Sequence, residues 1–240
     1  MPSCEEVPDS SSKTLASNRS LNIALLGYRS NPYSGGQGIY LRYLARALTN
    51  AGHKVDVISG EPYPELDAGI NLIKLPGLNL FAEEKPFQAL KWRHLLSATD
   101  LFEWLSFNSG GFPEPYTFGR RLLRHLQRYG CHYDVIHDNQ SLAPALLTLQ
   151  RRGFPVVSTI HHPITYDRAI ALAHEKNWGM RLLIKRWHMF LRMQIRVAKK
   201  LRNIVTVSEN SKVDISEDFA VAPERLTVVY NGVDCTTFAP

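Results

Sequence analysis

Residues 22–59, NIALLGYRSNPYSGGQGIYLRYLARALTNAGHKVDVIS, carry the pattern of a βαβ unit. Residues 21–27 are an apolar run that ends in glycine, which predicts a buried strand. Residues 39–50 predict a helix with Arg42 and Arg46 on its polar face, and residues 54–59 predict a second strand. The apolar stripe of the helix consists of Ile39, Tyr40, Tyr43, Leu44, Ala47 and Leu48. Two strands joined in this way are expected to be parallel, with a right-handed crossover.

The alternation of strand and helix patterns continues along the chain. Further strands are predicted at 70–75, 133–139, 155–162, 203–208 and 225–232, and helices at 87–105, 117–130 and 141–153. Ser141 is the expected N-cap of the last of these helices, and Gly130 is expected to close the one before it. The sequence therefore predicts an α/β fold with a doubly wound, mostly parallel, Rossmann-like sheet.

Composition limits the class of protein. The 240 residues are 44% hydrophobic and carry a net charge of +6, which suits a globular domain with an anionic partner. Three isolated cysteines suggest a reducing, cytoplasmic location, and no apolar run approaches the length of a membrane span. Residues 1–20 are polar and rich in serine, and we expect them to form a disordered tail rather than a secretory signal.

In such a sheet, ligands bind at the carboxyl ends of the strands. These ends are expected at residues 27–38, 137–140, 160–167, 208–212 and 230–234, which collect glycines, histidines, aspartates and a lysine. This clustering predicts a functional site at one edge of the sheet.

Gly35 and Gly36 precede a helix, where backbone N–H groups can face an anion. The alternative is a loop that uses glycine only for its turn geometry. The spacing does not match a dinucleotide fingerprint, because Leu41 stands where a third glycine is required. It does not match a P-loop either, because no lysine follows. Anion binding and plain turn geometry both remain open.

His161 lies at a predicted strand tip, where an imidazole can orient or deprotonate a hydroxyl group. A structural, hydrogen-bonded histidine is the alternative. His161 and His162 are adjacent on an extended segment and should point to opposite sides, so we expect no metal ion here. Ser208 suits an N-cap, and Lys212 suits either an anionic ligand or solvent.

Residues 181–202 combine eight basic residues with an apolar stripe at helical spacing and contain no acidic residue. Such a helix can lie on an anionic membrane surface, or can pack on the core with a basic outer face. Binding to nucleic acid is not expected, because no recognition motif accompanies the charge.

Several segments together resemble the N-terminal half of a retaining family 4 glycosyltransferase of the GT-B fold. They are the opening βαβ stretch, YDVIHDN, TIHH, IVTVSENSKVDI and LTVVYNGVDCTTFAP, in the order of the family and spanning roughly residues 21–240. The resemblance implies transfer of a hexose-type sugar from a nucleotide-sugar donor to a sugar, polyol or lipid-linked acceptor. It implies no metal ion and no bound cofactor.

The resemblance also implies roles for individual residues. His161 would line the reaction centre. The substrate-binding residues would be Gly35, Gly36, Gln37, Asn139, His162, Asp167, Ser208 and Lys212. Residues 21–222 would form the Rossmann-like domain, and residues 223–240 the last strand and the start of an interdomain hinge at Asn231 and Gly232.

The sequence stops at Pro240, where the family continues into a donor-binding domain. We therefore expect an acceptor-binding half that is inactive alone, cytoplasmic and able to sit at the inner membrane face. One alternative is a noncatalytic module completed by a separate donor-binding chain. The other is a nucleotide-binding Rossmann module of a different enzyme class, in which Asp56 would bind a ribose.

Overall fold

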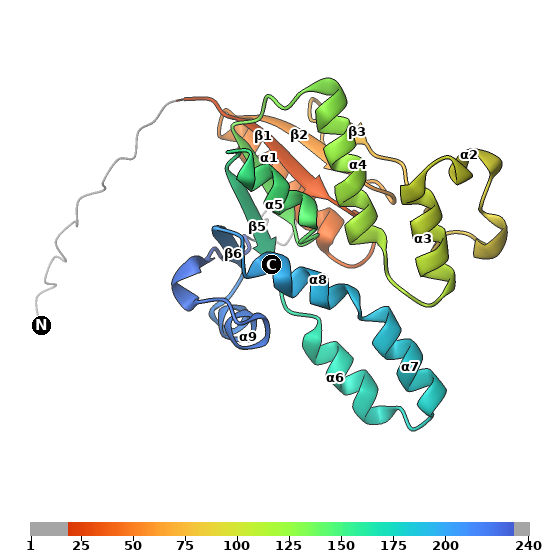
Figure 1. Cartoon of the computed structure of the whole chain (residues 1–240). Helices are drawn as coiled ribbons and strands as arrows, with labels where there is room; N and C mark the ends of the chain where they lie inside the picture. The colour runs from red at the N-terminus through yellow and green to blue at the C-terminus, as the bar shows by residue number, and fades with distance from the viewer. Residues whose placement is uncertain (1–18, 233–240) are drawn as a thin grey trace, which may run out of the picture.

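The computed structural model describes residues 19–232, and within them the chain forms a seven-stranded parallel sheet flanked by helices (Figure 1). The strands are β1 (Asn22–Gly27), β2 (Lys54–Ser59), β3 (Asn71–Lys74), β4 (Val135–Asn139), β5 (Val156–Ile160), β6 (Asn203–Thr206) and β7 (Leu226–Val228). The helices are α1 (Gln37–Asn50), α2 (Trp92–Leu95), α3 (Ala98–Asn108), α4 (Glu114–Tyr129), α5 (Pro144–Arg151), α6 (Thr165–His174), α7 (Trp178–Trp187), α8 (Phe190–Ala198) and α9 (Glu209–Phe219), with short 3-10 helices η1 (Pro86–Gln88) and η2 (Pro223–Arg225).

The order of the strands across the sheet is β3-β2-β1-β4-β5-β6-β7. The central strand β1 pairs with β2 from Asn22 opposite Lys54, and with β4 from Ile23 opposite Val135, both in parallel. The order reverses between β1 and β4, and a doubly wound sheet opens a crevice at the carboxyl ends of its strands at such a reversal. The predicted fold class is confirmed. The expected tail before Arg19 and the segment after Gly232 lie outside the described residues.

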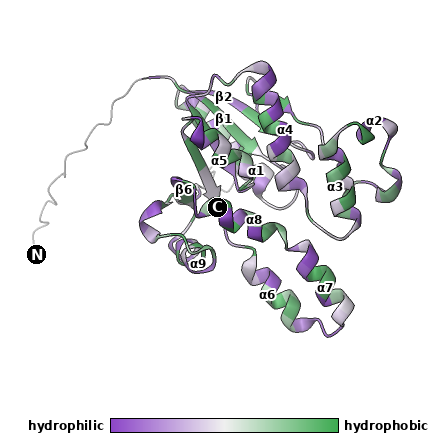
Figure 2. Ribbon diagram, viewed as in Figure 1, coloured by the Kyte–Doolittle hydropathy of each residue, from purple (hydrophilic) through white to green (hydrophobic). Residues whose placement is uncertain are grey.

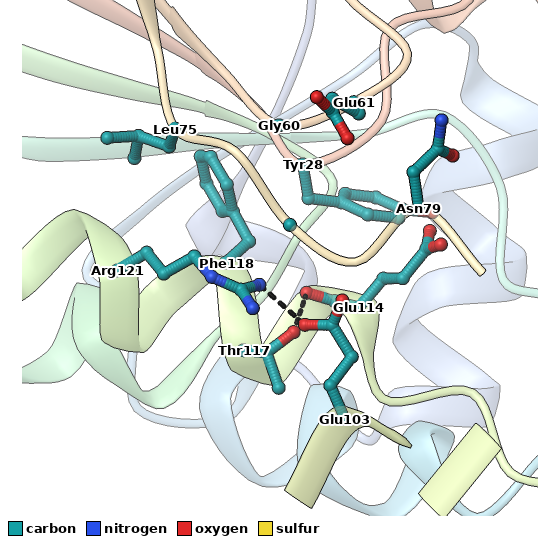
Figure 3. A pocket seen from close by; sticks show the side chains of 11 residues that line it. Tyr28, Gly60, Glu61, Leu75, Asn79, Glu103, Glu114, Thr117, Phe118 and Arg121 are labelled. Atoms are coloured by element: carbon teal, nitrogen blue, oxygen red, sulfur yellow. Dashed lines mark hydrogen bonds and ion pairs between the residues drawn. The ribbon is translucent and has the colours of Figure 1, made fainter. Parts of the chain in front are cut away.

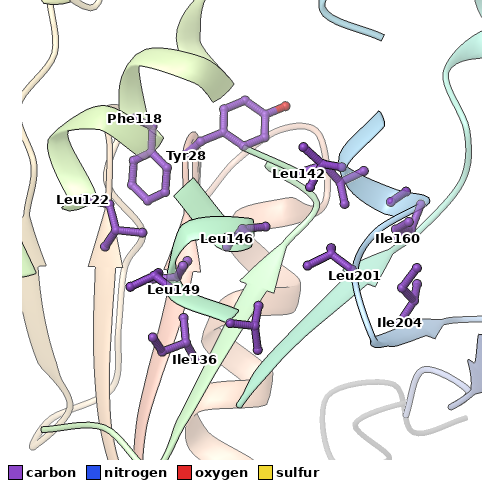
Figure 4. Packing of buried hydrophobic residues seen from close by; sticks show 14 of the residues in the cluster. Tyr28, Phe118, Leu122, Ile136, Leu142, Leu146, Leu149, Ile160, Leu201 and Ile204 are labelled. Atoms are coloured by element: carbon purple, nitrogen blue, oxygen red, sulfur yellow. The ribbon is translucent and has the colours of Figure 1, made fainter. Parts of the chain in front are cut away.

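Alternation along β1 gives the sheet two buried faces. Ile23 and Leu25 pack with Leu41 and Ala45 of α1 on one face. Leu26 belongs to the larger cluster on the other face, which is covered by α4, α5, α8 and α9. Figure 4 shows this second cluster, in which side chains of α4 and α5 meet those of β4, β5 and β6. Fully burying one such leucine or isoleucine contributes about 1.5–3 kcal/mol to stability. The two clusters therefore hold the helices against the two faces of the sheet.

Two of the expected helices are divided in the structure. The helix predicted over 87–105 is divided into η1, α2 and α3, because Ser97 caps a new helix by accepting a hydrogen bond from the Asp100 N–H at 3.3 Å. The single basic helix predicted over 181–202 is divided into α7 and α8 at His188 and Met189. Figure 1 shows α7 paired with α6 as a hairpin that projects from the body, whereas α8 lies against it.

The prediction that Ser141 caps a helix is wrong. Helix α5 begins at Pro144 with Ala143 as its N-cap. The Ser141 hydroxyl donates instead to the Asp138 carboxylate, which also accepts from the Leu142 N–H at 3.1 Å and the Ser158 hydroxyl at 2.8 Å. These bonds hold a tight turn after β4, in which Leu142 has a positive φ of 48°.

The apolar stripe predicted for α1 is also partly wrong. Leu41 and Ala45 are its buried side chains, while Ile39 is 45% exposed and Tyr43 is 37% exposed. Helix α1 therefore rests on β1 and β2 by a face that is rotated from the predicted one. This rotation leaves Tyr40 half-buried beside the carboxyl ends of β4 and β5.

Candidate functional site

The loop with the glycine pair leads directly into α1. Gly35 and Gly36 both have positive φ, 80° and 70°, and Gly36 is the N-cap of the helix. Both glycines are exposed, and a Cβ atom added to either would meet nothing within 4 Å. The left-handed geometry accounts for glycine at both positions, and the open space leaves room for a ligand at the positive end of the helix.

Gly38, the next glycine, lies where the backbone of the preceding loop leaves no room for a side chain. A Cβ atom at Gly38 would lie 2.3 Å from the Asn31 carbonyl oxygen and 2.5 Å from that of Ser30. Helix α1 thus starts in direct contact with the loop that precedes it. The loop and the first turn of α1 therefore pack closely against each other at the carboxyl end of β1.

Three of the predicted site residues form one hydrogen-bonded group. The Asn139 side-chain amide donates to the Gln37 carbonyl oxygen at 3.1 Å, which ties the end of β4 to the start of α1. The Asn139 Oδ1 atom lies 2.7 Å from His161 Nε2. Asn139 is 2% exposed, and His161 follows β5 directly. The structure therefore brings Gln37, Asn139 and His161 together where the sequence placed a site.

Several further residues complete the surroundings of His161. The Tyr40 ring meets the His161 ring edge to face, with centroids 4.6 Å apart. The Gln140 side chain accepts from the His161 N–H and donates to the His162 carbonyl oxygen, both at 2.8 Å. His137 Nε2 lies 2.7 Å from the Thr159 hydroxyl, which lies 3.3 Å from that of Tyr40.

Burial dominates the electrostatics of this network. It lowers the pKa of His161 to about 4, and the neighbouring His162 adds to this effect. Burial is likewise the main cause that lowers the pKa of His137 to about 4, with a contribution from His161. Both imidazoles are therefore neutral at physiological pH, and they can exchange hydrogen bonds with hydroxyl groups but carry no charge.

Other predicted site residues lie apart from this network. His162 and Asp167 are exposed and approach each other to 3.9 Å between Nε2 and Oδ2. Ser208 caps α9, accepting from the Ser211 N–H at 3.0 Å, as the structural alternative predicted. Lys212 lies one turn into α9 and is half-buried. Asn231 and Gly232 are exposed.

Sequence reasoning missed Tyr40 and Thr159, because Tyr40 fitted an apolar stripe and Thr159 lies inside a strand. It also missed Arg168 on α6, whose buried Nε has no hydrogen-bond partner within residues 19–232. The ribose-binding role considered for Asp56 is wrong. This carboxylate lies within β2, where it accepts from the Tyr133 hydroxyl at 2.8 Å and the Asn71 amide at 3.0 Å.

A small pocket lies at the carboxyl ends of β1, β2 and β3 (Figure 3). Arg121 bridges Glu103 and Asp100 at 2.5 and 2.6 Å, and Arg29 pairs with Glu114 at 3.0 Å. The pocket encloses about 20 Å³, which is room for about one water molecule. We therefore interpret this cluster as a structural support for the edge, and the network around His161 as the ligand-facing part.

The fold and this edge define a Rossmann-like glycosyltransferase domain. The chain belongs to Glycosyltransferase Family 4, whose family model matches residues 34–237. A curated relative, the MMP alpha-(1->4)-mannosyltransferase of Mycolicibacterium hassiacum, is 46% identical over 221 residues. That match covers 92% of this chain, and the chain spans 54% of the length of the relative.

A solved structure shares the fold. The catalytic domain of starch synthase IV from Arabidopsis thaliana, bound to ADP and acarbose, aligns with a TM-score of 0.52 and 13% sequence identity. The alignment covers 91% of this chain and 53% of that domain. The fold described here thus matches about half of that catalytic domain.

Proposed function

We propose that this chain is the acceptor-binding half of a retaining glycosyltransferase that transfers a mannosyl group from a nucleotide-sugar donor to a sugar acceptor, forming an α-(1→4) linkage. The observation that carries the proposal is the 46% identity to a mannosyltransferase across 92% of the chain. The choice of mannose and of the linkage comes from that relative. The choice of the acceptor side comes from the site.

The chemistry of the edge supports a role in binding hydroxyl groups. Around His161, the side chains of Asn139, Gln140, Thr159 and Tyr40 are uncharged. Neutral donors and acceptors at fixed positions suit the hydroxyl groups of a sugar, because each unpaired buried partner penalises an incorrect substrate. His161 is placed to orient the attacking hydroxyl group or the sugar that is transferred.

Transfer also requires partners for the negative charge that develops on the leaving diphosphate. The exposed glycine loop at the start of α1 offers backbone N–H groups, and Arg168 and Lys212 offer cations near the carboxyl ends of β5 and β6. We assign the rest of this task to a donor-binding domain. Residues 21–222 would then form the Rossmann-like domain, and residues 223–240 the last strand and the start of the hinge, at Asn231 and Gly232.

Titration of the chain with mannose oligosaccharides, followed by NMR, tests the acceptor assignment. We expect the His161 and Tyr40 signals to shift with mannose oligosaccharides and to stay unchanged with glucose oligosaccharides of equal length. The His161→Gln variant should bind at least about tenfold more weakly, equivalent to about 1.4 kcal/mol. Saturable binding that leaves the residues of this edge unaffected would contradict the acceptor assignment.

An activity assay tests the incompleteness of the site. The chain alone should transfer radiolabelled mannose at a rate close to background. A longer protein that carries residues 1–240 followed by a donor-binding domain should transfer it efficiently. Rapid turnover by the 240-residue chain alone would show that transfer does not need a separate donor-binding domain.

A contact with an anionic membrane surface is the second part of the proposal. Residues 176–202 contain nine basic residues and no acidic one. Trp178 and Leu182 of α7 are 76% and 55% exposed. The ribbon in Figure 2, coloured by hydropathy, shows hydrophobic residues along the projecting α6–α7 hairpin. No helix within residues 19–232 is long and apolar enough to cross a membrane. An exposed tryptophan beside basic residues suits the interface of a bilayer.

Co-sedimentation with vesicles tests this contact. We expect the chain to bind vesicles with anionic lipids at low salt, and the double variant Trp178→Ser, Leu182→Ser to lose most of the binding. The variant Tyr129→Ser removes another exposed aromatic side chain, on α4, and should bind as the wild type does. Equal recovery of the wild type and the double variant would contradict the membrane contact.

A further inference from the structure

The hydrogen bonds of Asn139 determine the protonation of its neighbour. A backbone carbonyl oxygen can only accept a hydrogen bond, so the Asn139 atom that faces the Gln37 carbonyl must be the Nδ2 amide group. The other atom of the side chain, Oδ1, then faces His161 Nε2 at 2.7 Å. Because Oδ1 can only accept, Nε2 must carry a hydrogen.

The opposite nitrogen of the ring is therefore the free one. His161 Nδ1 forms no hydrogen bond with any residue from 19 to 232, and it is not among the buried atoms left without a partner. The rest of the ring is fixed, because Tyr40 packs against it edge to face and Gln140 holds the backbone N–H of the same residue. Rotation of the imidazole would break the bond to Asn139.

We infer that Asn139 is a positioning residue that holds His161 as the tautomer with its hydrogen on Nε2, so that Nδ1 is presented to a ligand as a hydrogen-bond acceptor. The tautomer follows from the geometry alone. Only the identity of the donor, a hydroxyl group of a sugar, rests on the proposed function. The contact that Asn139 makes with Gln37 also couples this choice to the start of α1, so the glycine loop and the imidazole are oriented together.

The groups that face the ring are compatible with this state. His137 lies nearby and bonds to Thr159, and the His162 side chain is exposed and next in sequence. No carboxylate bonds to the ring within the described chain, so the neutral form is stable there. A neutral ring with an open Nδ1 can receive a proton from an acceptor hydroxyl or simply orient it.

Long-range ¹H–¹⁵N correlation spectra of the labelled chain test the inference at pH 7. The wild type should show a neutral His161 with a slowly exchanging proton on Nε2 and none on Nδ1. The His161 signals are assigned by their absence from the spectrum of the His161→Gln variant. A wild-type spectrum with the proton on Nδ1, or with a rapidly exchanging Nε2 proton, would overturn the inference.

Two variants test the part played by Asn139. Asn139→Ala removes the acceptor and should abolish the slowly exchanging signal, while Asn139→Asp keeps an acceptor at the same place and should retain it. A signal that survives unchanged in Asn139→Ala would overturn the role of Asn139. If a variant fails to fold, the wild-type spectrum decides the tautomer. These readouts involve no sugar transfer, so the tautomer can be correct even where the transferase assay fails.

Discussion

The neutral state of His161 makes the stability of the chain depend on pH in a way that can be calculated. Burial lowers its pKa to about 4 from an ordinary value of 6.5. Between these values the unfolded chain binds a proton that the folded chain does not. The sign of the linkage is therefore that the free energy of unfolding falls as the pH drops from about 6.5 toward 4. For this group alone the relation gives a loss of about 2 kcal/mol between pH 7 and pH 5.

The assay compares urea unfolding of the wild type and of His161→Gln across this range. Other buried groups, such as His137, are present in both proteins, so their contribution largely cancels in the difference. We expect the wild type to lose about 2 kcal/mol more of its free energy of unfolding than His161→Gln as the pH falls from 7 to 5. His174→Gln removes an exposed histidine of α6 and should follow the wild type. Parallel curves for the wild type and His161→Gln would refute the buried, neutral state of His161.

Further predictions concern the supports of the edge, each measured as the free energy of unfolding in urea. Gly38→Ala should cost at least about 2 kcal/mol, because its Cβ would collide with two loop carbonyl oxygens. Gly153→Ala is the control, with a positive φ but nothing within 4 Å, and should cost only about 1 kcal/mol. Asp138→Ala should cost about 3 kcal/mol, because it leaves buried hydroxyl and N–H donors unpaired. Arg121→Met should cost about 3 kcal/mol, because it leaves the buried carboxylate of Glu103 without its cation. A loss below about 0.5 kcal/mol in Gly38→Ala, Asp138→Ala or Arg121→Met would contradict the corresponding contact.

The fold could be predicted from the sequence because its strands and helices each have a simple pattern of apolar and polar residues. Short apolar runs that end in polar residues give buried parallel strands, and the helices between them place successive strands side by side. The same logic locates the edge, since the parallel strands place their carboxyl ends together. Gln37, Asn139 and His161 were thus expected near one another although 124 positions separate the first from the last.

The sequence patterns could not predict which side chains at this edge of the sheet contact one another. Periodicity assigned Tyr40 to an apolar stripe, but the packing of Leu41 rotates α1 and leaves the Tyr40 ring against His161. The break between α7 and α8 was also hidden, because the charges and apolar residues continue through it in helical register. What breaks the helix is tertiary contact: Arg186 of α7 bonds to the Ser109 hydroxyl after α3, whereas α8 packs on α5.

The side chains around His161 are uncharged because burial disfavours a charged group. A charged imidazole beside Asn139 would have to be paired or hydrated, and the enclosed network provides only neutral partners. His161 is therefore kept uncharged, and the other predicted site residues with ionisable side chains, Lys212, His162 and Asp167, form no side-chain hydrogen bond with its ring. Neutral hydrogen-bonding groups suit the hydroxyl groups of a ligand. They are poor partners for phosphate, whose binding relies on cations and helix N-termini. In the proposed function, recognition of a sugar hydroxyl at His161 and stabilisation of a diphosphate at the glycine loop would be separate tasks. The hydrogen bond between Asn139 and the Gln37 carbonyl oxygen joins the two places.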